Sequence, residues 1–188
     1  MWYVRRLLVD GNGEGPAASA AGGRRAVWLA CATCAWAWLF SLQSFYYAAG
    51  GTFGGNAFPP VLVEPLLRRE PAAVSLMWST GALPVLVGLF ALALVARPRA
   101  WLPRWLLLGA ACFGVLLMAG YEGLASLVQH ALMVAGVLPI PPELGAESAR
   151  WHLWLFDPWW LLGGILLALT AWQGRHRPPP QVEGAQRR

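Results

Sequence analysis

Lysine is absent from this sequence, and all 14 basic residues are arginine. Charge of either sign is scarce: 12% of the residues are charged, whereas 57% are hydrophobic. An average soluble domain carries charge on about 25% of its residues. The composition therefore excludes an ordinary soluble protein, and we expect no nucleic-acid partner.

Cysteine and histidine are also rare, with three residues of each. Cys31 and Cys34 form a C-x-x-C pair, and Cys112 follows much later in the chain. Their apolar surroundings disfavour the thiolate that redox chemistry needs, so a redox role is only an alternative. The histidines show no zinc-ligand spacing, and we expect no metal site and no cofactor.

Four long apolar segments free of arginine dominate the rest of the chain, at about residues 26–49, 72–96, 105–126 and 158–173. A transmembrane helix needs about 20 predominantly apolar residues, because each residue rises 1.5 Å and the hydrocarbon core is about 30 Å thick. The segments predict an all-α integral membrane protein, a four-helix transmembrane bundle over residues 26–173.

The arginines predict the orientation of this bundle. Eleven of the fourteen lie before the first segment, between the second and third, or after the fourth; the others are Arg68, Arg69 and Arg150. Positive residues stay on the cytoplasmic side during insertion. We therefore expect a plasma-membrane protein whose two termini are cytoplasmic. The Gly/Ala/Ser-rich composition of residues 1–25 and the proline run in residues 174–188 further predict that both tails are disordered.

The third segment continues beyond the length of a simple span. A straight helix over residues 104–138 would be about 52 Å long, which exceeds the hydrocarbon core. Gly120 and Gly123, on either side of Glu122, predict a bend. Apolar residues then recur at helical spacing opposite a polar stripe. This pattern predicts a short amphipathic helix on the outer face.

Asp157 and Pro158 mark the expected start of the fourth span. Aspartate is a preferred N-cap residue, and proline is favoured at the first helical position. Asp157 is therefore predicted to cap a helix with its carboxylate.

Several polar side chains are expected near one outer level of the bundle. They are Gln43, Tyr46, Tyr47, Glu122, Gln129, His130, His152 and Asp157. Ionisable groups at membrane depth are costly and often functional, so this set predicts a ligand-binding pocket, with Glu122 and His130 as candidate acid and base. The alternative is structural, with the tyrosines in an aromatic belt and His152 a wet interfacial side chain.

Three blocks of sequence resemble one known family: FYYAAGGTFG at residues 45–54, LPRWLLL at 102–108 and FDPWWLLGG at 156–164. The family is one of uncharacterised bacterial four-span membrane proteins, frequent in GC-rich Gram-positive bacteria. Its relatives often carry histidine at the position of Ser44 and tryptophan at that of Tyr47. The resemblance implies no established activity, cofactor or catalytic residue.

Non-enzymatic binding of a lipid, a small hydrophobic ligand or a membrane partner through the outer face is the function that we expect from the sequence. One alternative is a membrane-embedded enzyme that acts on a lipid or quinone through Glu122 and His130. A second is a small transporter, which would need to oligomerise. Membrane lipids are the expected partners, together with a membrane protein or further copies of this chain.

Overall fold

In the computed structural model, residues 16–96 and 103–175 are described, and every regular element within them is helical. Four helical stretches are long and apolar enough to cross a membrane: Gly22–Ala48, Pro71–Val95, Trp105–Val134 and Ala146–Gly174. The predicted all-α fold with four spans is confirmed. The chain is a multi-pass membrane protein.

The first two spans are α2 (Pro16–Ala48) and α4 (Pro71–Ala96), which pack closely along their length. Between them lie the 3₁₀ turn η1 (Gly55–Ala57) and the short helix α3 (Pro60–Leu67). Because α2 begins at Pro16, residues 16–25 are helical rather than part of a disordered tail. This stretch is rich in alanine, the strongest helix former. The rest of the expected tails, residues 1–15 and 176–188, lies outside the described residues.

The third span combines α5 (Arg104–Val115), η2 (Leu116–Ala125) and α6 (Ser126–Val134) in one continuous path. The predicted short helix after Glu122 is present as α6, which contacts the beginning of the fourth span. It does not follow a break at the glycines. The segment η2 is a π-helix instead, and the residues at its two boundaries keep helical backbone angles.

The fourth span begins earlier than residue 158. It runs through α7 (Ala146–Trp151), the π-helical segment η3 (His152–Phe156) and α8 (Asp157–Arg175). The left-handed bend that precedes it is at Gly145, whose φ is 75°. The helix start that we expected at Asp157 is therefore an interior position of a longer helical stretch.

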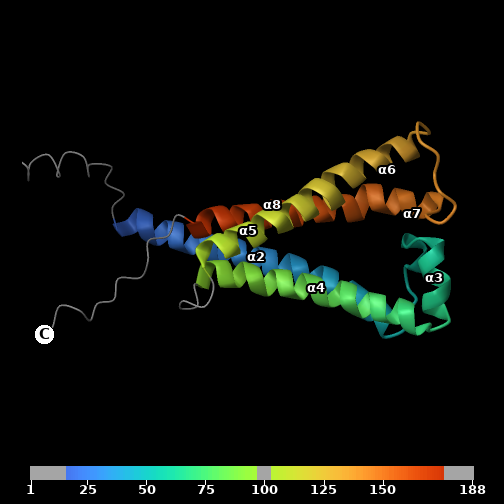
Figure 1. The fold of residues 1–188 in the computed structure, drawn as a ribbon, viewed down its shortest axis with the longest axis horizontal. Helices are drawn as coiled ribbons and strands as arrows, with labels where there is room; N and C mark the ends of the chain where they lie inside the picture. Colours follow the sequence, from blue (N-terminus) through green and yellow to red (C-terminus); the bar gives the residue numbers. More distant parts are fainter. Residues whose placement is uncertain (1–15, 97–102, 176–188) are drawn as a thin grey trace, which may run out of the picture.

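The long helices form two pairs, α2 with α4 and the third span with the fourth (Figure 1). The pairs lie together near the start of α2 and the end of α8, and they spread apart towards the end that carries α3 and α7. We call this second end the cap end, comprising residues 49–70 and 126–157. There α7 packs on η1, and the Ser148 hydroxyl donates a hydrogen bond to the Ala57 carbonyl at 3.3 Å.

The core between the pairs surrounds the large side chain of Trp36 and combines alanines with larger apolar residues: Ala37, Ala91, Leu94, Ala111, Met118 and Leu167. Its indole N–H donates to the Trp159 carbonyl at 2.9 Å, and its ring stacks with that of Trp159 at 6.1 Å between centroids. A Cβ at Gly163 would lie 2.1 Å from the Trp36 ring, so only glycine fits there. This contact joins α2 to α8.

Candidate functional site

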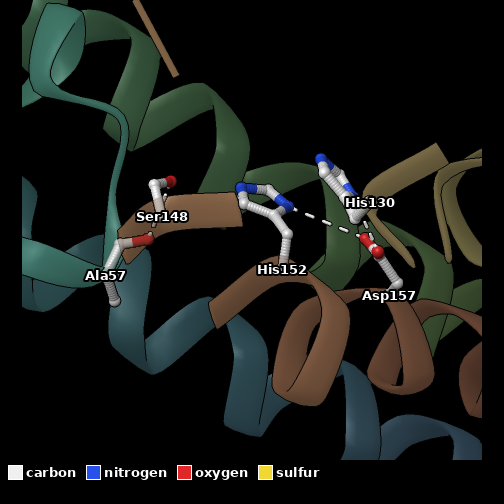
Figure 2. A network of polar contacts seen from close by, with 5 residues as sticks. All are labelled: Ala57, His130, Ser148, His152 and Asp157. Atoms are coloured by element: carbon white, nitrogen blue, oxygen red, sulfur yellow. Dashed lines mark hydrogen bonds and ion pairs between the residues drawn. The ribbon is translucent and has the colours of Figure 1, made fainter. Parts of the chain in front are cut away.

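Two histidines and one aspartate meet at the cap end, although they are dispersed in the sequence (Figure 2). His130 comes from α6, His152 from η3 and Asp157 from the first position of α8. His130 Nδ1 lies 2.7 Å from Asp157 Oδ2, and His152 Nδ1 lies 3.7 Å from Oδ1. Each carboxylate oxygen therefore faces one imidazole. We call these three residues the His-Asp-His cluster.

The π-helical segment η3 makes this geometry possible. His152 and Asp157 are five residues apart, a spacing that places side chains on different faces of an α-helix. In a π-helical turn the backbone hydrogen bond joins residues five apart, so these positions lie above one another. The widened turn thus directs the His152 side chain towards the Asp157 carboxylate.

The cluster corrects our interpretation of Asp157 as an N-cap. Its backbone is helical, with φ −65° and ψ −46°, and α7 and η3 continue the helix on its N-terminal side. The amides that a cap would satisfy are therefore already within a helix. Asp157 is 1% exposed, and its carboxylate instead contacts the two imidazoles.

A second feature is a groove of about 600 Å³ between α4 and the α5–η2 segment. These two parts do not pack closely against each other, whereas both contact α8. Trp36, Trp160 and Leu167 contribute to the lining from α2 and α8. Most of the remaining lining is apolar, including Phe90 and Phe113. The groove is thus a largely hydrophobic recess within the spans.

Among the described residues that line this groove, Glu122 is the only one with a charged side chain. Counted at 1.5 Å per residue from Trp105, where the third candidate span begins, it lies about 26 Å along the helix, a distance shorter than the hydrocarbon core of about 30 Å. Within the described residues, no hydrogen bond or ion pair involves its side chain. Ser79 and Thr80 of α4 line the same groove.

The structure does not assemble the predicted acid and base. Glu122 and His130 are eight residues apart on one helical path, about 12 Å along its axis. Glu122 lines the groove, whereas His130 is hydrogen-bonded within the cluster. Their different surroundings give no support to an enzyme that uses them as a catalytic pair.

The other predicted ligand-binding residues lie elsewhere. The Tyr47 hydroxyl donates to the Phe53 carbonyl at 2.6 Å, and the Tyr46 hydroxyl accepts from the Phe53 N–H at 3.1 Å. Both tyrosines therefore hold the loop that follows α2. Gln43 is half-buried and Gln129 is exposed, and neither lines the groove nor joins the cluster.

The three cysteines are free: Cys31 and Cys34 lie one turn apart on α2, whereas Cys112 lies on α5. Cys34 packs against Gly88 of α4, and a Cβ on that glycine would lie 3.3 Å from the Cys34 sulfur. Cys112 instead lines an apolar pocket between α5 and α8. This arrangement gives the redox alternative no relay of neighbouring thiols.

Two features of the site were missed in the sequence. His152 was interpreted as an interfacial side chain, because α-helical periodicity does not align it with Asp157. The groove was missed because its lining comes from four helices. No local pattern signals either feature, because the five-residue spacing of His152 and Asp157 aligns two side chains only in a π-helical turn.

A comparison with known proteins identifies the family of this chain. A family model described as "Protein of unknown function (DUF3995)" matches residues 37–167, well over half of the chain. Searches of the curated proteins and of the solved structures found no match. The matched region includes the three residues of the cluster and the described groove-lining residues other than Trp36, which directly precedes it. The chain belongs to the DUF3995 family of proteins of unknown function.

Proposed function

We propose that this protein binds a membrane lipid in the groove between α4 and the α5–η2 segment. The lipid chain lies against the apolar lining, and a hydroxyl or ammonium group of the lipid meets Glu122. The observation that carries the proposal is a carboxyl group without a partner among the described residues, in an otherwise apolar recess at membrane depth.

The size and lining of the groove support this occupant. Small-molecule sites usually have volumes of about 300–1,000 Å³ and combine apolar walls with a few polar groups. The groove falls within this range at about 600 Å³. Because α4 does not pack closely against α5 or η2, a lipid can enter sideways from the bilayer without crossing water.

The polar groups can recognise a donor on the ligand. An ionisable side chain within a membrane is costly unless it is paired, so a hydrogen-bond donor on the lipid would stabilise Glu122. The hydroxyls of Ser79 and Thr80 donate to carbonyls of their own helix, at Ser75 and Leu76. Their oxygens remain able to accept a hydrogen bond from the same lipid group.

Photocrosslinking tests the proposal. The purified protein would be reconstituted in phosphatidylcholine vesicles, whose lipid has no hydroxyl or N–H group, with a diazirine-labelled diacylglycerol whose free hydroxyl is the donor. We expect crosslinks to concentrate in α4 and α5–η2. Ala110→Phe fills the groove and should remove these crosslinks, whereas Ala82→Phe, at an exposed position outside the lining, should leave them unchanged.

Glu122→Gln supplies the second test. It removes the charge with little change in shape, and the loss of about 1.5 kcal/mol from a charge-assisted hydrogen bond weakens competition by unlabelled diacylglycerol roughly tenfold. Uniform labelling of all lipid-facing helices, or labelling that persists in Ala110→Phe, would contradict the proposal.

A further inference from the structure

We propose that His130, His152 and Asp157 bind one zinc ion at the cap end of the bundle. This site is separate from the lipid groove, since none of the three residues lines it. The inference starts from the convergence of three metal-ligating side chains, one from each of α6, η3 and α8 (Figure 2).

The distances suit a single ion. Each residue offers one ligand atom, and these atoms all lie within 4.8 Å of one another. Zinc binds histidine nitrogen and carboxylate oxygen at about 2.0–2.2 Å, which places two tetrahedral ligands roughly 3.3 Å apart. The two contacts of Asp157, at 2.7 Å and 3.7 Å, bracket this separation. Small side-chain rotations therefore suffice to form the site.

The types of ligand also favour zinc. Imidazole is a ligand for borderline metals such as zinc, whereas magnesium and calcium prefer sites made only of oxygen. Two histidines and one carboxylate leave the fourth tetrahedral position for water or another donor. The rings of His130 and His152 lie 4.8 Å apart, tilted by 32°, so both can approach an ion beside Asp157.

The burial of Asp157 favours a positive charge next to its carboxylate. Asp157 is 1% exposed, and its recorded polar contacts within residues 16–96 and 103–175 are with the two histidines. A buried carboxylate is costly without a compensating cation. A divalent ion held by all three residues provides this compensation more fully than hydrogen bonds from the imidazoles alone.

The position of the cluster allows ions to reach it from water. His130 lies about 37 Å along the helical path from Trp105, where the third candidate span begins. With a tilt of about 20°, this distance still exceeds the hydrocarbon thickness of about 30 Å. His152 remains half-buried, so its side of the cluster is accessible.

Zinc titration of the full chain tests the inference. The protein would carry no histidine tag, be stripped with a chelator in mild detergent, and be titrated with zinc chloride by calorimetry. We expect one zinc per chain. X-ray absorption should show nitrogen and oxygen ligands at about 2.0–2.1 Å with imidazole scattering, whereas a sulfur shell near 2.3 Å would assign the metal to cysteines and overturn the proposal.

Histidine variants locate the site. His130→Gln and His152→Gln should each weaken zinc binding at least 100-fold, since even indirect partners of metal ligands contribute 10–100-fold. The third histidine, His176, lies outside the described residues, and His176→Gln should bind as the native chain does. Circular dichroism checks that each variant keeps its helical fold. If one variant fails to fold, the zinc affinity of the other and the X-ray absorption spectrum of the native chain still test the site.

Two results would overturn the inference. One is a native chain that binds less than one zinc, which would leave a hydrogen-bonded cluster without metal. The other is zinc affinity that persists in the folded His130→Gln and His152→Gln variants.

Discussion

Replacing Gly123 with alanine should destabilise the bundle, whereas the same replacement at Gly120 should not. The two glycines lie three residues apart in η2. A Cβ at Gly123 would lie 2.8 Å from the Leu161 Cα and 2.9 Å from its backbone nitrogen. A Cβ at Gly120 would meet nothing within 4 Å. The variants thus make one chemical change in two different environments.

The magnitude follows from this difference. Optimal contacts between non-bonded carbon atoms are about 3.5–4.0 Å, so the new methyl group would force η2 and α8 apart. The atoms that it meets include backbone, which cannot move aside as a flexible side chain can. Overpacking of this kind costs about 1–3 kcal/mol, while alanine gains up to about 1 kcal/mol over glycine in helix propensity. The propensity gain applies to both variants, so their unfolding free energies should differ by about 1–3 kcal/mol.

Unfolding in mixed micelles by titration with sodium dodecyl sulfate, followed by helical circular dichroism, measures this difference. The Gly120→Ala variant should match or exceed the native stability, and Gly123→Ala should fall below it. Equal stability of the two variants would refute the close approach of η2 and α8. The same conclusion would follow if Gly123→Ala were more stable than the native protein.

Two further predictions concern the aromatic core and the orientation. Trp36→Phe removes the indole hydrogen bond to a carbonyl of α8 and should lower the unfolding free energy by about 1 kcal/mol. Trp38→Phe, at a half-exposed position of α2, should have little effect. Equal losses of unfolding free energy in the two variants would contradict the role of the hydrogen bond. The orientation can be tested in a chain without its native cysteines. Because we expect the cap end to face outside, Phe53→Cys should react with an impermeant maleimide on intact cells, and Pro103→Cys should not. The reverse labelling would invert the proposed orientation.

The spans were predictable because their signal is local. A run of about 20 apolar residues without charge predicts a transmembrane helix whatever its neighbours are. The boundaries were harder to predict, as residues 16–25 and 146–157 show. Both stretches contain polar or charged residues, and helical structure there depends on local propensity or on contacts at the cap end rather than on hydropathy.

The candidate sites were predictable only in part. His130 and Asp157 were expected at one outer level, and they lie 2.7 Å apart. Glu122 was expected to act with His130 because both were placed at a similar depth in the membrane, but a similar depth does not bring two side chains into contact. The two residues share a helical path but lie about 12 Å apart along it.

The sequence by itself determined that this is an all-helical protein with four spans, because in hydrocarbon a helix satisfies its own backbone hydrogen bonds. Only the tertiary structure decided how the spans meet. The two π-helical segments change which residues lie on the same face of the helix, and η3 directs the His152 side chain towards Asp157. The groove arises where α4 fails to pack against α5 and η2. Neither outcome follows from a linear pattern, since each depends on which residues of distant helices come into contact.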